Sequence, residues 1–425
     1  MLHPMVQVSR RHVLYIPGFD PVPPRAYRER YRREIAAQAR LSGFEVANGK
    51  GPRGARFGWH VDTVMEGAEV ATDLEVLYWA DIVRKGMAAG IGATYLQLAR
   101  TAWTYIGSGA LFRLMRLRKG PVIAALYPVV VLLGQAALAA AIWYLGYFAF
   151  HAGSERLLDL ILGEALLQPM FGLRGWFGLL VVGPACAWLF LRWCARRDHL
   201  YAWYLMKDYA FSSSLNGAYP PEQEARMRDF ADRIAEVLQG DVDEVLVVGH
   251  SSGAYIAISV LADLIRAGRV PADGPVLSLL TLGHVVPMVS FLPEATRLRA
   301  DLAFLSVQDV PWVDVTAPGD GCAFALCDPV AVSGVAPEGK KWPLVISAAF
   351  TQTLSPERQK ALKWHLFELH FQYLNAFDNL PDAPDAYDYF RITAGPLTLA
   401  DRYATRAPSR SRIEAPVNRF TDIAA

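Results

Sequence analysis

A run of 29 residues without a charged side chain, residues 122–150, constrains the fold of this chain more than any other feature. As a helix rising about 1.5 Å per residue it would be about 43 Å long, and the hydrocarbon core of a bilayer is about 30 Å thick. A second charge-free run, residues 175–191, would reach about 26 Å as a helix and contains Pro184. We therefore expect a transmembrane helical hairpin. Two buried core helices or a re-entrant pair are the alternatives.

Basic residues flank the predicted hairpin on its two outer sides. The loop between the two runs, residues 151–174, carries only two arginines against three acidic residues. Because the cytoplasmic flanks of membrane spans are enriched in Lys and Arg, we expect two spans in the inner (cytoplasmic) membrane, with both soluble halves of the chain on the cytoplasmic side. The basic residues of the outer flanks are Arg113, Arg116, Arg118 and Lys119 before the first run, and Arg192, Arg196 and Arg197 after the second.

The stretch 91–115, ahead of the first run, has apolar residues such as Tyr95, Leu98, Trp103 and Ile106 at helical spacing. Two interpretations stay open for it. One is an amphipathic helix on the inner leaflet of the membrane, and the other is a helix that packs against the core.

On either side of the hairpin, strand-like and helix-like segments alternate along the chain. Such alternation is typical of an α/β fold with a mostly parallel sheet flanked by helices. The predicted strands are residues 12–16, 55–65, 69–78, 244–248, 276–282, 303–307, 312–316 and 344–348, and the predicted helices are 25–39, 221–238 and 254–266.

These patterns divide the chain into four parts. Residues 1–119 form the N-terminal part of the α/β domain, and residues 120–195 form the inserted hairpin. Residues 196–400 form the C-terminal part of the domain. Residues 401–425 are predicted to be a mobile tail, because the chain becomes rich in Pro, Ala, Asp and Arg from Leu380 onward.

A strand–turn–helix pattern surrounds Ser251. The apolar run 245–248 leads into Gly-His-Ser-Ser-Gly at 249–253, and helix-like residues follow. In a G-x-S-x-G turn the serine lies at the tip, and the glycines allow strand and helix to pass closely. Nucleophilic attack requires such an exposed hydroxyl beside helical N–H groups. The pattern therefore predicts Ser251 as a nucleophile, the alternative being an ordinary turn of small residues.

A serine nucleophile needs a base and an acid that orients the base, and in the elbow-bearing fold the acid follows the serine in the chain. Asp320 lies in a loop directly after the predicted strand 312–316, at the edge of the sheet where it can reach an imidazole. Asp314 lies within that strand and is expected to point into a face of the sheet. We favour Asp320 as the acid and keep Asp314 as the alternative.

Two histidines, His365 and His370, follow the candidate acids. On a helix, five residues separate them by about 140°, so they are not expected to share one role. His370 is favoured as the base because it begins a segment after the last predicted strand, and His365 is the alternative.

The developing oxyanion needs two N–H donors. One is expected from Ser252, the residue after the nucleophile. The other is expected from Phe19, because Pro17 and Gly18 form a turn directly after the first predicted strand. An ordinary strand-ending Pro-Gly turn is the alternative for this loop.

The chain resembles the α/β-hydrolase superfamily, in particular its bacterial lipase- or esterase-like members, at residues 17–19, at 249–253, at Asp320 and at His370 with Tyr373. The resemblance spans both soluble halves but not the hairpin. It implies acyl transfer to water through a serine-bound acyl intermediate. The chain departs from the family pattern in having Pro-Gly where the oxyanion loop usually has His-Gly, and in carrying the hairpin before the elbow.

We therefore expect a membrane-anchored serine hydrolase that cleaves carboxylic esters. Lipid or acyl esters are favoured because the anchor holds the site near a bilayer. The alternative is a non-enzymatic membrane protein that uses a hydrolase-like domain for binding or assembly. A net charge of +1 and the lack of a Gly-x4-Gly-Lys-Ser/Thr loop argue against nucleic acids and nucleotides as partners. No cofactor or metal is expected, because the four cysteines lack zinc-site spacing.

Overall fold

The computed structural model describes residues 7–51, 57–87, 90–162, 171–363, 365–381, 383 and 385–424. Its internal contacts divide the chain into two compact units. The first, here called the sheet unit, comprises Met1–Gly86, Ala102–Ala124 and Phe211–Ala425. The second, here called the helical unit, comprises Met87–Thr101 and Ala125–Ala210. Each unit is described by itself below.

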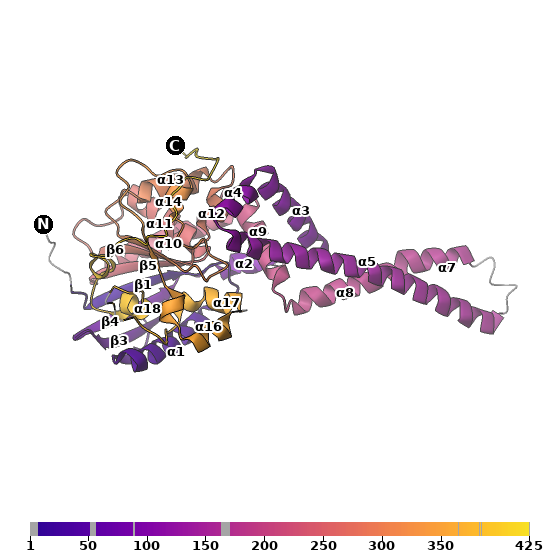
Figure 1. Ribbon diagram of the computed structural model, residues 1–425, viewed down its shortest axis with the longest axis horizontal. Coiled ribbons are helices and arrows are strands. Elements are labelled where there is room, and N and C mark those ends of the chain that lie inside the picture. Colours follow the sequence, from indigo (N-terminus) through magenta and orange to yellow (C-terminus); the bar gives the residue numbers. More distant parts are fainter. Residues whose placement is uncertain are drawn as a thin grey trace. The chain divides into compact units, whose positions relative to one another are not determined.

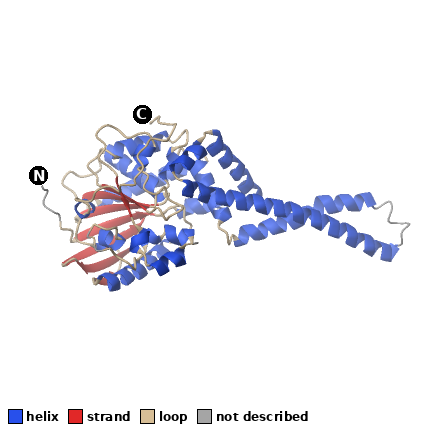
Figure 2. Ribbon diagram, in the orientation of Figure 1, coloured by secondary structure: helices blue, strands red, loops and turns tan. Residues whose placement is uncertain are grey.

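The sheet unit contains one sheet of eight strands in the order β2-β3-β4-β1-β5-β6-β7-β8. β3 pairs antiparallel with both of its neighbours, and all other pairings are parallel. The prediction of an α/β fold with a mostly parallel sheet is therefore confirmed (Figures 1 and 2). The strands are β1 Arg10–Ile16, β2 Glu45–Gly49, β3 Gly58–Met65, β4 Ala68–Val76, β5 Glu244–His250, β6 Val276–Leu282, β7 Trp312–Thr316 and β8 Leu344–Ser347.

Helices cover both faces of this sheet (Figure 1). One face carries α10 Pro221–Val237, α11 Gly253–Arg266 and α13 Thr296–Leu305, of which α11 packs directly on β1 and β5. The other carries α1 Pro24–Ser42, α16 Pro356–Leu362 and α18 Tyr389–Ala394, whose apolar residues join one core cluster. Successive side chains of a strand point to opposite faces, so Val13 and Tyr15 of β1 enter that cluster. The central strands are buried on both sides.

The remaining helices include those of the membrane-candidate segments. They are α2 Ala80–Met87, α3 Ile91–Gly107, α4 Ala110–Leu117, α5 Lys119–Leu162, α7 Phe171–Phe177, α8 Gly183–Arg197, α9 Ala202–Ser213, α12 Val286–Ser290, α14 Pro329–Val332, α15 Phe350–Thr353, α17 Leu366–His370 and α19 Leu399–Arg402, with the π-helix η2 Gly178–Val182 and the 3-10 helix η3 Gln372–Leu374.

Two helical segments are long and apolar enough to cross a membrane, judged by length and composition. Lys119–Leu157 has a mean hydropathy of 2.2 and Gly172–Arg197 one of 1.6, and only 22% of each most apolar window is buried. In the first segment, Val130, Tyr144 and Leu145 expose between 65% and 68% of their surface. Both segments extend beyond the predicted runs 122–150 and 175–191.

Within the helical unit, small residues let the two long segments approach closely. A Cβ built on Gly183 would lie 2.1 Å from Cδ1 of Trp143, whose indole N–H donates to the carbonyl of Leu179 (2.9 Å). Such contacts are typical of helix pairs that pack without a hydrophobic driving force. The turn η2 immediately precedes Gly183 and Pro184. Since proline has no N–H and its ring displaces the preceding turn, a local π-helix accommodates it.

Two local predictions need correction. Residues 303–307 were predicted as a strand, but residues up to Leu305 belong to helix α13. Its buried residues Leu298, Leu302 and Leu305 recur at the helical spacing of three or four, and the short apolar run at its end has no periodicity that separates helix from strand. Strand β2 was not predicted, because its sequence Glu-Val-Ala-Asn-Gly lacks an apolar run. None of its residues is buried in the structure.

The C-terminal segment follows the surface of the sheet unit. The N–H of Ser409 donates to the carbonyl of Val345 (2.9 Å), and that of Ile413 to Leu326 (2.7 Å). The Asn418 amide donates to the carbonyl of Ser290 (2.9 Å). The prediction of a mobile tail over residues 401–425 did not anticipate these contacts.

A buried ion pair joins the two halves of the sheet unit. Nε of Arg11 on β1 donates to Glu244 on β5 (2.7 Å), and both side chains are fully buried. Glu244 also accepts from the hydroxyl of Ser278 and the N–H of Leu399, both at 2.8 Å. The remaining Arg11 donors bond to backbone carbonyls of residues 395 and 397. The carboxylate therefore compensates a charge that has no access to water.

Replacing Glu244 by Gln should destabilise the protein by about 3–5 kcal/mol, since breaking a buried pair leaves an uncompensated charge. Chemical denaturation of the purified chain in detergent micelles measures this. Asp309→Asn removes the exposed partner of Lys341 and should change stability by no more than about 0.5 kcal/mol. Equal effects of the two substitutions would contradict this account of Glu244.

Candidate active site

Ser251 lies at the tip of the turn between β5 and α11 in a left-handed conformation, with φ at 57°. A non-glycine residue rarely adopts this conformation without a local reason. The glycines on either side allow the turn. A Cβ on Gly249 would lie 2.7 Å from Cα of Ala254, and one on Gly253 would lie 2.1 Å from the carbonyl oxygen of Ile16. Strand, turn and helix are therefore arranged as the sequence predicted.

The loop after β1 lies against this turn. A Cβ on Gly18 would lie 3.0 Å from Cβ and 3.4 Å from Oγ of Ser251. The indole of Trp79 holds the loop by donating to the carbonyl of Pro17 (2.9 Å). The ring of Phe19 is buried and packs 6.0 Å from that of Trp79, measured between centroids. The structure thus brings the predicted oxyanion loop to the predicted nucleophile.

Ser252 occupies the N-cap position of α11. The first N–H groups of a helix have no partner within the helix, and they concentrate positive potential at that end. This helix end and the loop of Gly18 and Phe19, the two segments predicted to supply the oxyanion donors, therefore both adjoin the Ser251 turn.

Asp320 and His370 form a buried hydrogen bond, with 2.7 Å between Oδ2 and Nδ1. The hydroxyl of Tyr373 donates to the same oxygen (3.0 Å), and the N–H of Cys322 donates to Oδ1 (2.9 Å). Burial disfavours the charged carboxylate, but His370 and these two donors outweigh it, so the pKa of Asp320 lies below its ordinary value. Asp320 is therefore an anion that fixes one nitrogen of His370.

Tyr373 is held in place as a donor. Its hydroxyl accepts from the N–H of Ala317 (2.9 Å), at the start of the loop that carries Asp320. Burial and the charge of Asp320 raise the pKa of Tyr373, so its proton stays available for the carboxylate. The sequence marked Tyr373 only through a family resemblance, because nothing in a linear pattern indicates a contact over 53 residues.

The end of β6 brings His370 towards Ser251. The N–H of Ser251 donates to the carbonyl of Leu282 (2.9 Å), and a Cβ on Gly283 would lie 3.1 Å from Cε1 of His370. Gly283 has φ at 54° and leaves this space open. Between these two described residues, no hydrogen bond joins the Ser251 hydroxyl to the His370 ring. Hydrogen bonds of this kind are often long in free enzymes and tighten when substrate binds.

His250, inside the elbow, contacts the backbone and the ring of His370. Its Nε2 lies 3.0 Å from the carbonyl oxygen of His370, and the two rings are 4.8 Å apart. Burial, and next the charge of His370, lowers the pKa of His250 to about 3. His250 is therefore neutral and donates to that carbonyl. The elbow motif leaves this position open to any residue, so no sequence pattern predicts the contact.

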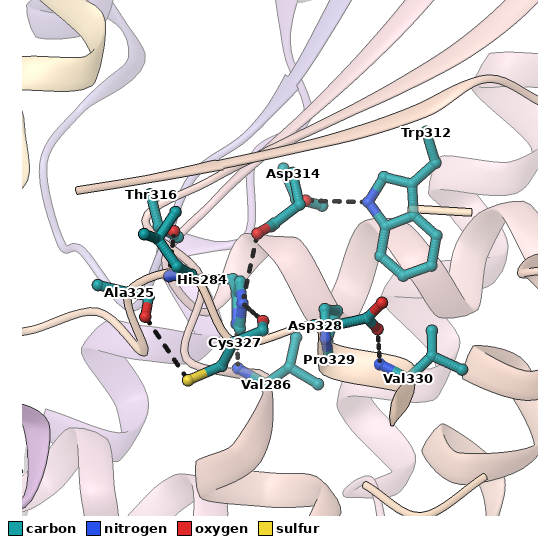
Figure 3. A network of polar contacts seen from close by, with 12 residues as sticks. His284, Val286, Trp312, Asp314, Thr316, Ala325, Cys327, Asp328, Pro329 and Val330 are labelled. Carbon is teal, nitrogen blue, oxygen red and sulfur yellow. Dashed lines mark hydrogen bonds and ion pairs between the residues drawn. The ribbon is translucent and has the colours of Figure 1, made fainter. Parts of the chain in front are cut away.

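The two alternative residues lie elsewhere. His365 is exposed, and its Nδ1 lies 2.9 Å from the carbonyl of Ala361. Asp314 is fully buried on β7 and accepts a hydrogen bond from the Thr281 hydroxyl (2.6 Å). Its other oxygen is 3.6 Å from Nε2 of His284 (Figure 3). The structure thus brings Asp320, not Asp314, to His370.

His284 connects β6 to the loop that carries Asp320 (Figure 3). Its Nδ1 accepts from the N–H of Val286 (3.3 Å), so the ring proton of the neutral form is on Nε2, which donates to the carbonyl of Cys327 (3.0 Å). The carbonyl of His284 accepts from the N–H of Phe324 (3.1 Å). The side chain and the backbone carbonyl of His284 therefore both bind the segment that follows Asp320.

Asp320, Cys322 and His370 are also close enough to hold a metal ion, with one candidate ligand atom from each within 4.8 Å of the others. Two observations disfavour this use. The nitrogen and an oxygen of the His–Asp pair already bond to each other. Burial and the charge of Asp320 raise the pKa of Cys322, which keeps it a thiol, whereas metals bind the thiolate. The donor set fits a hydrogen-bonded pair better than a metal centre.

The chain matches none of the protein-family models, curated proteins or solved structures with which it was compared. The interpretation of the site therefore depends on its own geometry and chemistry.

Asp314→Asn should make the protein more stable at pH 8, by up to about 3 kcal/mol. Burial raises the pKa of Asp314 to about 6. Because the folded state binds this proton more tightly than the unfolded state, the stability associated with it is complete below about pH 4 and is lost as the pH rises to about 6. The amide keeps the acceptor for Thr281 and has no charge to desolvate.

Thermal unfolding of both proteins in detergent between pH 4 and 8 tests this prediction. The difference in melting temperature between the two proteins should grow from about pH 4 to somewhat above pH 6 and then stay constant up to pH 8. A variant that is less stable than the parent protein at pH 8 would mean that His284 stabilises the Asp314 carboxylate enough to prevent the rise in its pKa.

Proposed function

We propose that the protein is a membrane-anchored serine hydrolase of the α/β-hydrolase type that cleaves carboxylic esters. The observation that carries the proposal is the buried 2.7 Å bond between Asp320 and His370, beside a left-handed Ser251. Acid and base follow the serine in the chain order of that superfamily. A structural ion pair alone would not need a strained serine and an adjacent glycine loop.

In the proposed mechanism, His370 removes the proton of the Ser251 hydroxyl through Nε2 as the oxygen attacks the ester carbonyl. Asp320 keeps the opposite nitrogen protonated and stabilises the imidazolium that forms. The N–H groups of Phe19 and Ser252 stabilise the negative oxygen of the tetrahedral intermediate. His370 then protonates the leaving alcohol. Water repeats the sequence on the acyl-enzyme and releases the acid.

A lipid or acyl ester is the substrate class that this arrangement favours. The loop after Asp320 contacts the beginning of the first membrane-candidate helix, since Nε of Arg118 donates to the carbonyl of Ala325 (2.8 Å). A Cβ on Gly120 would lie 3.7 Å from Cα of Gly321. If α5 crosses the inner membrane with its basic flank in the cytoplasm, the Ser251 site lies near the cytoplasmic surface of the bilayer. A non-enzymatic role of the same domain is the competing proposal.

A fluorophosphonate probe should label the full-length protein in membranes, because an activated serine displaces fluoride from phosphorus. Ser251→Ala should abolish labelling, and Ser214→Ala, which alters an exposed serine, should preserve it. Gel fluorescence of the labelled membranes measures both. No labelling of the folded wild-type protein would favour the non-enzymatic alternative.

Asp320→Asn should lower kcat for p-nitrophenyl esters on the order of 10⁴-fold, because the imidazole loses the group that fixes its tautomer. Asp314→Asn, which changes the other buried carboxylate of the same strand and loop, should retain activity within about tenfold. Initial rates over a series of acyl chain lengths measure both effects and the substrate preference. A wild-type preference for short chains would count against lipid substrates.

A further inference from the structure

Helices α3 and α4 expose large apolar side chains in a protein whose other helices of the sheet unit mostly bury theirs. Trp103 is 80% exposed, Phe112 59% and Ile106 52%. Trp103 and Ile106 are three residues apart on α3 and so share one face of that helix. Exposed apolar residues that cluster in this way indicate a contact with a membrane or a partner. These three residues are here called the apolar surface of α3 and α4.

The opposite sides of both helices are packed into the sheet unit. The hydroxyl of Tyr105 donates to the carbonyl of Met288 (2.8 Å). On α4, Ala110, Leu114 and Leu117 are buried. The part of α3 from Ala102 onward and helix α4 are therefore fixed to the unit that carries Ser251, and their exposed side chains are not free to turn inward. The packed side fits the interpretation of residues 91–115 as a helix that packs against the core, and the interpretation as a helix on the membrane stays a proposal.

Along the chain, the charged residues on either side of these helices have one sign. Between Asp81 and Glu155 the chain contains no acidic residue, whereas it has seven basic ones. Arg116 and Lys119 are exposed and have no acidic partner among the described residues. Basic side chains beside exposed Trp and Phe are complementary to anionic phospholipid headgroups, where aromatic rings also prefer to lie. A cationic rim of this kind would repel a second copy of the same surface.

The apolar surface also continues along the chain into α5. Helix α4 ends at Leu117, α5 begins at Lys119, and Ile123 in its first turns is 62% exposed. The charge-free part of α5, from residue 122 on, therefore begins within a few residues of α4. Among possible occupants, a lipid surface is the one that the neighbouring segment already implies.

We propose that Trp103, Ile106 and Phe112 insert into the headgroup layer of an anionic bilayer, with Arg116 and Lys119 bound to its phosphates, and so fix the orientation of the sheet unit on the membrane. The inference rests on the membrane insertion of α5 that is part of the proposed function, but not on catalysis at Ser251. The ligand is the surface of the bilayer itself, and no individual lipid needs a built pocket.

Position-specific fluorescence of the full-length protein in lipid nanodiscs tests this proposal. An environment-sensitive fluorescent amino acid replaces Trp103 in one sample, Leu138 on α5 in a second, and the highly exposed Asp241 in a third. The probe at position 103 should show blue-shifted emission and quenching by brominated lipids, and quenching should increase when phosphatidylglycerol is added to phosphatidylcholine. The probe at position 241 should remain aqueous and unquenched.

Each result separates the proposals. Quenching at position 138 but not at 103 overturns the headgroup contact while leaving the span intact, and loss of quenching at both overturns the span itself. Blue-shifted emission at 103 without lipid quenching means that protein covers the surface, which also overturns the inference. In a probe-bearing Arg116→Gln, Lys119→Gln protein, the phosphatidylglycerol-dependent increase should fall, by about fivefold in apparent partitioning for each charge removed.

None of these readouts depends on turnover. A fluorophosphonate measurement on the same nanodiscs reports Ser251 independently. Lipid quenching at position 103 without serine labelling would support the membrane contact and contradict the hydrolase proposal.

Discussion

The candidate site depends on keeping one carboxylate ionised where water cannot reach it. A buried carboxylate without partners takes up a proton, because desolvation disfavours its charge. Asp320 avoids this through three donors: the ring of His370, the hydroxyl of Tyr373 and the N–H of Cys322. His370 and Tyr373 come from one segment, at the end of α17 and in η3, and Cys322 comes from the loop of Asp320 itself. The ionised state therefore requires that this loop and that segment meet correctly. The tautomer of His370 follows from that meeting.

Asp314 provides the comparison within the same protein. It is as deeply buried as Asp320 and only six residues away, but it has a hydrogen bond from Thr281 alone. Its second oxygen lies 3.6 Å from His284 and has no hydrogen-bond partner among the described residues. Its pKa is accordingly raised to about 6, whereas that of Asp320 is lowered. The number of donors, and not the depth of burial, separates the two. That difference makes Asp320 the carboxylate able to support a positive imidazole.

Much of this arrangement could be predicted from local pattern. The elbow around Ser251 has a strand, two glycines and a helix in order, and each leaves a signal within ten residues. Asp320 could be preferred over Asp314 because a loop residue beyond a strand reaches the sheet edge and a residue within it does not. The residues that hold Asp320 and His370 in place could not be predicted from local pattern. Tyr373, His250 and His284 act through contacts set by tertiary packing, and the short apolar end of α13 has the same composition as a strand. The spacing of residues along the sequence indicates neither these tertiary contacts nor the helical conformation at the end of α13.

The inserted helical segment leaves and re-enters the sheet unit beside two loops of the candidate site. Arg118, at the entry to the inserted segment, bonds to the loop that follows Asp320. Phe211, in the helix by which the chain returns, packs 5.4 Å from the ring of Phe19 in the oxyanion loop. Both contacts lie within the sheet unit. The two ends of the insertion therefore adjoin the two loops that the proposed chemistry requires, one supplying the acid and the other the oxyanion donor.

An inserted segment that served only as a tether could leave the domain from any surface loop, since connections tolerate insertions wherever few contacts are disturbed. Its attachment at these two loops is the arrangement expected if the position of the bilayer and the geometry of the Ser251 site depend on each other.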